Sequence, residues 1–267
     1  MTLLVNSEKR LCHEKQQIAS AFGRAAMRYD SLAHYQQNSG RQLLSQLTAE
    51  LAKQGQTSPR KILDAGCGTG FFSQRMKAQG NEVTALDLSD GMLDIAKQKN
   101  AATHYLCADM EVLPFGDEAF DVVFSNLAIQ WCRDFNPALE ELYRVTKRGG
   151  IVAFTTLAEN SLGELSQAWE MLDSHSHVNS FLSYQGIIDN CSAWRTQLAL
   201  QQDTLYFANI YDLLNSLKGI GATHLTAGRK AGLMTRQRLQ QLDSVYPATE
   251  QGLPLTYHTV FGLIYRD

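Results

Sequence analysis

Residues 62–70 read ILDAGCGTG, and this segment constrains the fold more than any other part of the chain. A short apolar run ends in Asp64, and three glycines follow at two-residue spacing, Gly66, Gly68 and Gly70. Glycine has no Cβ, so the backbone can turn sharply and lie close to a ligand. The next residues, FFSQRMKAQ, have helical character, and the first turn of a helix presents free N–H groups. The segment therefore predicts a buried strand, a tight turn and a helix that together bind a nucleotide.

The composition excludes several classes of protein. A net charge of −3 excludes a globally basic nucleic-acid binder. No apolar run approaches the roughly 20 residues that span a membrane, and the N-terminal MTLLVNSEKR lacks the longer apolar run of a signal peptide. The five cysteines form no CxxC pair, so we expect neither a zinc site nor a disulfide framework. Such cysteine usage is typical of a cytoplasmic protein.

Segments of strand and helix character alternate between residues 61 and 157. The predicted strands are 61–65, 82–87, 104–109, 120–126 and 149–157, and the predicted helices are 70–79, 89–98 and 136–146. This alternation is typical of a doubly wound α/β fold with a parallel sheet. Two later segments, 198–207 and 254–266, have strand character and would complete a seven-stranded, mostly parallel sheet.

The remaining residues have mainly helical patterns, and we expect them to be additions to a single domain that covers residues 1–267. Residues 1–54 are expected to form an N-terminal helical lid, and residues 60–157 the cofactor-binding core. Residues 158–250 are expected to form lid and substrate-binding or carrier-binding insertions before the final strand. In open α/β sheets such additions lie near the carboxyl ends of the strands, where ligands bind.

The glycine spacing and three acids indicate which nucleotide binds. A dinucleotide fold requires G-x-G-x-x-G, whereas this chain has G-x-G-x-G with Phe71 next. Asp64, Asp87 and Asp109 end three adjacent predicted strands. A dinucleotide has no use for three such acids. A ligand with an amino-acid ammonium, a ribose diol and an adenine amine offers a donor to each.

With LDLS at 86–89 and the stretch ADMEVLPF…FDVVFSNLAIQW, these features resemble the class I S-adenosylmethionine-dependent methyltransferases over roughly residues 60–157. The resemblance implies a Rossmann-like fold, S-adenosylmethionine as methyl donor, S-adenosylhomocysteine as product, and no metal. Asp64 would face the ammonium, Gly66 and Gly68 would shape the loop beneath the methionyl part, and Asp87 would bind the ribose hydroxyls. Leu88 and Met92 would pack against the adenine, Asp109 with the Met110 backbone would read the adenine edge, and Asn126 would line the methionyl end. His175 and His177 are interpreted as surface residues, since residues two apart do not share a helix face.

The flanking segments narrow the resemblance. AFGRAAMRYD, LAIQWCRD, ELYRVTKRGGIVAFTTL, SLKGIGATH and PLTYHTVFGLI resemble the malonyl-acyl carrier protein O-methyltransferases of the biotin pathway, across almost the whole chain. The resemblance implies methylation of the free carboxylate of malonyl-acyl carrier protein, or malonyl-CoA, to give the methyl ester that primes pimeloyl synthesis. A methyltransferase acting on another small molecule, such as a quinone precursor, fits the loop equally. A nucleic-acid or protein methyltransferase and a non-enzymatic binding protein fit less well.

This chemistry sets requirements for the substrate site. A carboxylate is already ionised at neutral pH, so methyl transfer needs positioning rather than a general base. A dry site favours a reaction in which opposite charges combine, and we expect an apolar lining from Phe22, Tyr29, Trp131, Phe154 and Phe181. Candidates to orient the substrate are Tyr29, Lys218, His224 and Arg229.

A basic segment suggests a docking surface. No acid occurs between Leu213 and Leu242, although the whole chain is net acidic. Carrier proteins are acidic, so we expect this segment to dock the acyl carrier protein. The alternative explanation of the same charge pattern is a helical face exposed to solvent. The basic residues are Lys218, Arg229, Lys230, Arg236 and Arg238.

Overall fold

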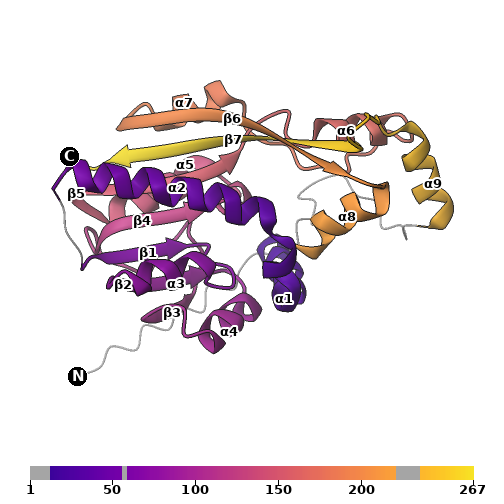
Figure 1. Cartoon of the computed structure of the whole chain (residues 1–267). Coiled ribbons are helices and arrows are strands. Elements are labelled where there is room, and N and C mark those ends of the chain that lie inside the picture. The colour runs from indigo at the N-terminus through magenta and orange to yellow at the C-terminus, as the bar shows by residue number, and fades with distance from the viewer. Residues whose placement is uncertain (1–12, 56–58, 221–234) are drawn as a thin grey trace.

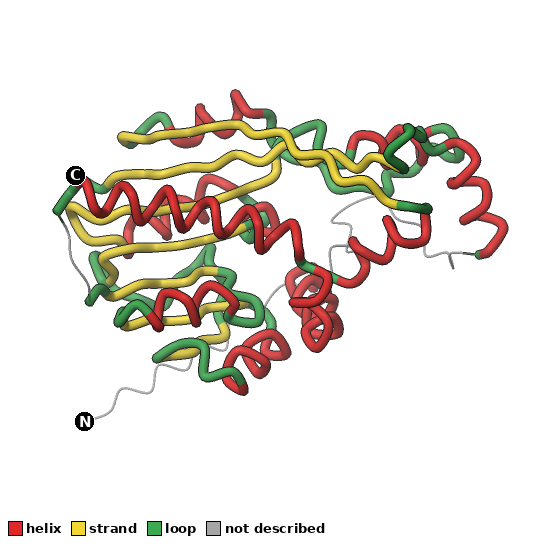
Figure 2. The backbone as a smooth tube through the Cα atoms, viewed as in Figure 1, coloured by secondary structure: helices red, strands yellow, loops and turns green. Residues whose placement is uncertain are grey.

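The computed structural model of the chain describes residues 13–55, 59–220 and 235–267, and its centre is one seven-stranded sheet (Figures 1 and 2). The strand order is β3-β2-β1-β4-β5-β7-β6, and β7 runs antiparallel to both of its neighbours. The doubly wound, mostly parallel sheet predicted from the sequence is therefore confirmed. The strands are β1 Lys61–Ala65, β2 Glu82–Asp87, β3 His104–Cys107, β4 Phe120–Asn126, β5 Thr146–Leu157, β6 Arg195–Phe207 and β7 Leu253–Tyr265.

Helices of the described ranges cover both faces of the sheet and extend past one end of it (Figure 1). The sequence pattern missed α7 and the short 3-10 helix η1, because each is brief and buries few side chains. None of these helices is both long and apolar enough to span a membrane. The helices are α1 His13–Leu32, α2 His34–Lys53, α3 Phe71–Ala78, α4 Asp90–Gln98, η1 Ile129–Trp131, α5 Phe135–Val145, α6 Gly163–Glu170, α7 Tyr184–Cys191, α8 Ile210–Gly219 and α9 Arg236–Val245.

The expected N-terminal lid divides into two parts with different positions. Helix α2 packs on the face of the sheet, where Leu43, Leu47 and Leu51 are buried against strand residues. Helix α1 lies past the carboxyl ends of the parallel strands instead (Figure 1). Helix α1 is therefore placed to cover a ligand, and of α2 the first turn, with Tyr35, Gln36 and Gln37, also lines cavities at this edge.

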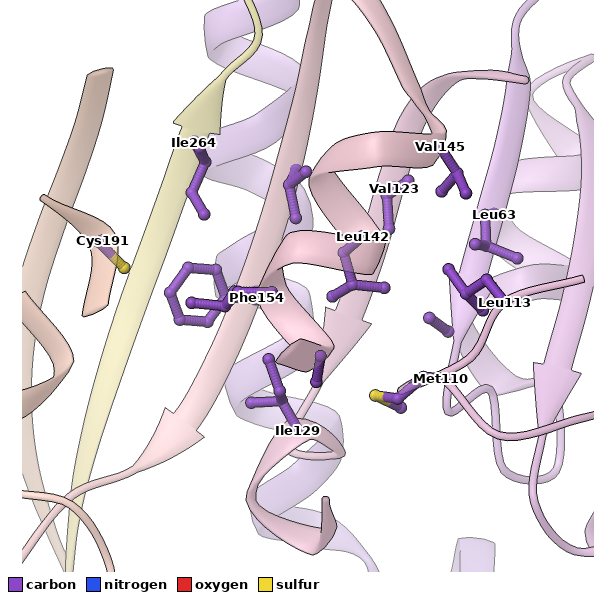
Figure 3. Packing of buried hydrophobic residues seen from close by; sticks show 14 of the residues in the cluster. Leu63, Met110, Leu113, Val123, Ile129, Leu142, Val145, Phe154, Cys191 and Ile264 are labelled. Carbon is purple, nitrogen blue, oxygen red and sulfur yellow. The ribbon is translucent and has the colours of Figure 1, made fainter. Parts of the chain in front are cut away.

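Phe154 belongs to the core, so its expected place in the lining of the substrate site is wrong. It is fully buried between the sheet and α5, with its ring centroid 6.3 Å from that of Phe135 (Figure 3). A Cβ at Gly262 on β7 would lie 2.3 Å from the Phe154 ring, so this glycine makes room for it. Alternate residues of the central strand β5 point into the core, and Phe154 is one of them.

Strands β6 and β7 are 13 residues long, and as a pair they continue beyond the ends of the other strands of the sheet. Helices α6, α8 and α9 gather around these projecting ends (Figure 1) and bury Trp169, Leu213, Leu242 and Leu255 in a second, smaller core. Helix α7 differs from these insertions, because Ile187 packs into the main core. At this end of the molecule the added helices are therefore α1, past the carboxyl ends of the parallel strands, and α6, α8 and α9 around the projecting ends of β6 and β7 (Figure 1).

Candidate active site

The glycine loop after β1 is shaped by two close approaches. The N–H groups of Gly66 and Cys67 both donate to the carbonyl of Leu86, at 2.8 and 2.9 Å. Gly66 has φ +78°, and a Cβ there would lie 2.3 Å from the Cβ of Ala128. Gly68 has φ +54°, and a Cβ there would meet no atom within 4 Å. Gly66 therefore permits close packing, whereas Gly68 leaves open space in which a ligand fits.

A cavity above this loop brings together the residues that the sequence assigned to the cofactor. We call it the cofactor cavity. Of the predicted cofactor residues, only Asp64 does not line it and instead lines a smaller cavity beside it. The two cavities share Tyr29, Gly66, Gly68 and Asn126 in their linings. The other predicted residues in the cofactor cavity are Asp87, Leu88, Met92, Asp109 and Met110.

Asp64 is a buried carboxyl group at the base of the smaller cavity. It is 2% exposed and accepts a hydrogen bond of 2.5 Å from the Ser73 hydroxyl. Burial raises the pKa of Asp64 to about 7, and the nearby Asp87 adds to the shift. A cationic ligand group beside Asp64 would reverse this shift, because an opposite charge favours the ionised form.

Asp87 at the end of β2 fixes the glycine loop. Its two carboxylate oxygens accept the N–H of Gly68 and the N–H of Ser89, each at 2.8 Å. Burial raises the pKa of Asp87 to about 6, although these backbone donors oppose the shift. A carboxylate has about four acceptor sites, so Asp87 keeps capacity for ligand hydroxyls.

Asp109 has a protein partner that the sequence reasoning missed. The ammonium of Lys15 forms ion pairs with Asp109 and with Glu111, and Lys15 lines the cofactor cavity. The sequence did carry a signal that Lys15 shares a helix face with residues of the predicted substrate site. Lys15, Ile18, Phe22 and Tyr29 recur at three-, four- and seven-residue intervals, which places them on one helix face.

Asn126 anchors α2 at the end of β4. Its amide donates to the Gln36 carbonyl at 2.9 Å, and its oxygen accepts from the hydroxyls of Ser39 and Thr155, at 3.0 and 2.9 Å. Asn126 lines both the cofactor cavity and the smaller cavity. Because these bonds use most of its polar capacity, Asn126 shapes the two cavities mainly by holding α2 in place.

A larger cavity of about 480 Å³ adjoins the cofactor cavity and has a largely aromatic and aliphatic lining. We call it the acyl cavity. Phe22, Tyr29 and Trp131 line both cavities, and the rings of Phe22 and Trp131 meet edge to face at 5.2 Å between centroids. Phe181 and Lys218 also line the acyl cavity.

Tyr29 lies where the cofactor cavity, the smaller cavity and the acyl cavity meet. Among the aromatic residues in the described part of the chain, it alone lines all three. Burial raises the pKa of Tyr29 well above its usual range, and the carboxylates of Asp87 and Asp30 reinforce the shift. Tyr29 is therefore a protonated phenol at neutral pH, and its hydroxyl can donate a hydrogen bond.

His177 is not the surface residue that the sequence suggested. Its ring stacks on Trp169 with centroids 4.1 Å apart, it contacts the Asp173 carboxylate at 3.0 Å, and it lines the acyl cavity. Spacing along a helix was the wrong argument, because His175 and His177 lie in a loop after α6. Among the described residues, no cluster of three or more histidine, cysteine or acidic side chains could bind a metal.

The basic segment is only partly described. His224, Arg229 and Lys230 lie outside the described residues. Lys218 and Arg236 are exposed, and Lys218 also lines the acyl cavity. The guanidinium of Arg238 pairs with Asp173 and lies 5.5 Å from the Trp169 ring centroid, so it has a structural role inside the chain.

The sheet topology, the G-x-G-x-G loop and the cavity beside it define a class I methyltransferase fold. The model of the methyltransferase domain family matches residues 63–154. Two solved structures share the fold. The first is an S-adenosylmethionine-dependent methyltransferase from Thermotoga maritima, with a TM-score of 0.54 and 16% sequence identity, covering 94% of this chain and 100% of that one. The second is 1,6-didemethyltoxoflavin-N1-methyltransferase from Burkholderia thailandensis, with a TM-score of 0.52 and 14% sequence identity, covering 94% of this chain and 88% of that one.

Sequence relatives identify the family within this class. The chain is 48% identical over 253 residues to the malonyl-acyl carrier protein O-methyltransferase of Serratia marcescens, covering 95% of this chain and 96% of that one. It is 49% identical over 254 residues to the enzyme of the same name from Yersinia pestis, covering 95% and 92%. The chain belongs to the malonyl-acyl carrier protein O-methyltransferase family.

Proposed function

We propose that this protein transfers a methyl group from S-adenosylmethionine to the free carboxylate of malonyl-acyl carrier protein in the cytoplasm. The product would be the malonyl methyl ester thioester that primes synthesis of the pimeloyl precursor of biotin. The observation that carries the proposal is the meeting of the cofactor cavity and the acyl cavity at Tyr29, Phe22 and Trp131. At this junction a donor in one cavity can reach an acceptor in the other.

The residues present fit the methyl donor. Gly68 leaves open space above the loop, and the buried Asp64 and the half-buried Asp87 are acids with raised pKa values that a cation and hydroxyl donors would satisfy. Asp64 would hold the ammonium, Asp87 the ribose, Leu88 and Met92 the adenine face, and Asp109 with the Met110 backbone the adenine edge. When bound, this ligand supplies an electrophilic methyl group on a sulfonium.

Tyr29 is the residue that we propose to orient the malonyl carboxylate. Its phenol stays protonated and can donate to one carboxylate oxygen, leaving the other free to attack. A neutral donor positions the anion without the strong ground-state stabilisation of a full ion pair. The aromatic walls from Phe22 and Trp131 exclude water, which favours the combination of opposite charges.

The carrier protein would dock beside the open end of the acyl cavity. In the described part of the basic segment, the exposed basic residues are Lys218, which lines the acyl cavity, and Arg236 at the start of α9. Arg229 and Lys230 remain candidates by sequence alone. Arg238 is the weakest candidate, because Asp173 already neutralises its charge.

The test is methyl transfer from labelled S-adenosylmethionine to malonyl-, succinyl- and acetyl-acyl carrier protein. We expect a base-labile methyl ester on the malonyl form alone. The acetyl form is the matched control, because it has the same arm and no free carboxylate. Transfer to none of the three, with transfer to a small phenolic quinone precursor, would instead favour the alternative substrate class.

A further inference from the structure

Lys15 of α1 is a buried cation with two carboxylate partners. Only 8% of its surface is exposed, and its ammonium forms ion pairs with Asp109 and Glu111. Burial alone would lower the pKa of Lys15, but the bonds to the two carboxylates raise it instead. The ammonium therefore stays charged, and its position depends on both acids.

Glu111 connects this ion pair to a wall of the acyl cavity. One of its carboxylate oxygens accepts the N–H of Asp134 at 3.0 Å, and the other accepts the N–H of Arg133 at 3.2 Å. These two residues follow closely after η1, which ends at Trp131. Through Glu111, Lys15 thus contacts the turn that positions Trp131.

Helix α1 meets the same wall directly, two turns further along. Lys15, Phe22 and Tyr29 are seven residues apart and lie on one helix face. Phe22 packs edge to face on Trp131, and both Phe22 and Tyr29 line the acyl cavity. Lys15 lines the cofactor cavity but not the acyl cavity. A shift of α1 would therefore remove two walls of a cavity that Lys15 itself does not touch.

The other end of α1 is also fixed to cofactor-binding elements. Asp30 accepts a hydrogen bond of 2.5 Å from the Thr69 hydroxyl of the glycine loop and pairs with Lys99. Between the two ends, Gly23 lies against Gly91 of α4, where a Cβ on Gly91 would be 2.9 Å from the Gly23 Cα. Both ends and the middle of α1 thus contact the cofactor side, its last residue Leu32 also packs against Gly219 of α8, and its inner face closes the acyl cavity.

We infer that Lys15 and Glu111 are positioning residues for the methyl acceptor, and that the malonyl thioester binds after the methyl donor. The inference rests on the proposed function. The ion pair fixes α1 and the η1 turn against one another, and this completes the acyl cavity. Because the contacts that hold α1 surround the cofactor cavity, ligand binding there stabilises the arrangement that the acyl group requires.

A purely cofactor-binding role for Lys15 has a different consequence. In that case, saturating S-adenosylmethionine would restore the wild-type KM for the malonyl thioester. A positioning role raises this KM even when the cofactor is saturating, because α1 is displaced in more of the cofactor-bound molecules. The two roles therefore separate in one measurement.

The first experiment compares three variants by the KM for malonyl-acyl carrier protein at saturating S-adenosylmethionine. We expect Lys15→Met to raise this KM about tenfold with kcat changed by less than about twofold, since charged hydrogen bonds are lost. Lys15→Arg keeps the charge and should stay near wild type. The matched control is Arg24→Met, because Arg24 is exposed on the outer face of α1 and bonds to Ser20 within the helix. An unchanged KM in Lys15→Met would overturn the positioning role.

Glu111→Gln tests whether the two residues act through one another. Glutamine keeps one oxygen for one of the two backbone donors, but its NH2 group cannot accept from the other, and it loses the charge that pairs with Lys15. We expect a rise in KM of about tenfold or more, and a rise in the double variant that is smaller than the product of the two single effects, because both changes remove the Lys15–Glu111 pair. A double variant whose effect equals the product of the two single effects would contradict the inference.

Calorimetry tests the order of binding without turnover. We expect malonyl-acyl carrier protein to bind wild type at least about tenfold more tightly when S-adenosylhomocysteine is present. Equal affinity with and without S-adenosylhomocysteine would overturn the order. Wild-type enzyme that transfers no methyl to the malonyl thioester would refute the proposed function instead, so the two failures are distinguishable.

Discussion

Replacing Asp64 with Asn should stabilise the ligand-free protein at high pH while weakening methyl-donor binding. Burial raises the pKa of Asp64 from 3.8 to about 7, so the folded protein favours the neutral carboxyl group. An acid with a raised pKa in the folded state costs stability as the pH rises from its unfolded pKa to its folded pKa. Above pH 7 this cost reaches about 4 kcal/mol, because each tenfold change in an acid dissociation constant corresponds to about 1.36 kcal/mol.

Asn cannot ionise, so the variant escapes this cost but gains an unpaired buried amide N–H, which costs about 1–3 kcal/mol. We expect the variant to be more stable than wild type by about 1–3 kcal/mol at pH 8. At pH 5 the wild-type carboxyl is mostly neutral, so the advantage should shrink by about 2–3 kcal/mol and disappear. Affinity for S-adenosylhomocysteine should fall at both pH values, because the ammonium loses its counter-charge.

Urea unfolding without ligand at pH 5 and pH 8, with calorimetric titration of S-adenosylhomocysteine, measures both effects. The matched control is Asp121→Asn. Burial would raise the pKa of Asp121, but the Lys147 ammonium and the Lys61 N–H keep it below its usual value, so this variant should lose stability above pH 4. An Asp64→Asn protein with the same stability difference from wild type at pH 5 and pH 8 would refute the reasoning.

Three further predictions address the catalytic end, the loop and the docking surface. Tyr29→Phe removes the hydroxyl that we propose to orient the carboxylate, so kcat should fall about 10- to 100-fold with S-adenosylhomocysteine affinity nearly unchanged; equal kcat would exclude this role. Gly66→Ala places a Cβ 2.3 Å from that of Ala128 at φ +78°, so thermal unfolding should show a lower Tm and calorimetry a loss of ligand binding. Gly68→Ala is strained by its φ of +54° but meets no atom, so it should lower the Tm less than Gly66→Ala and still lose affinity. Arg236→Glu should raise the KM for malonyl-acyl carrier protein at low salt but not for a malonyl thioester without the carrier; a rise for both would show that Arg236 acts inside the cavity.

The sheet was predictable because its signals are local. Each βα unit has an apolar strand, a turn residue and an amphipathic helix in order along the chain, so 61–65, 82–87 and 120–126 were predicted with the bounds that the structure has. The acids at the ends of β1 and β2 were located by the same rule, since parallel strands bring their carboxyl ends to one edge.

The environment of each site residue was less predictable. Asp109 looked like a free acceptor until the structure placed Lys15 beside it, from a segment 94 residues away in sequence. Phe154 looked like an apolar lining residue, although its strand position directs it into the core. His177 looked exposed, although Trp169 and Asp173 surround it. The deciding partner of Asp109 is distant in sequence, and the place of Phe154 depends on which face its strand buries. The partners of His177 are near in sequence, but only the path of the loop after α6 brings them together.

The sequence by itself determined the fold and predicted the class of ligand and the edge of the sheet that carries the candidate site, because glycine spacing, hydrophobic period and strand-end acids act over short stretches. Tertiary structure alone decided which side chains share a cavity. It folded α1 across the strand ends, so that Lys15, Phe22 and Tyr29 face residues from the loop after β3, from η1 and from the glycine loop. It also extended β6 and β7 beyond the sheet to build the acyl cavity. Such contacts join segments far apart in the chain, and no local pattern encodes their distances.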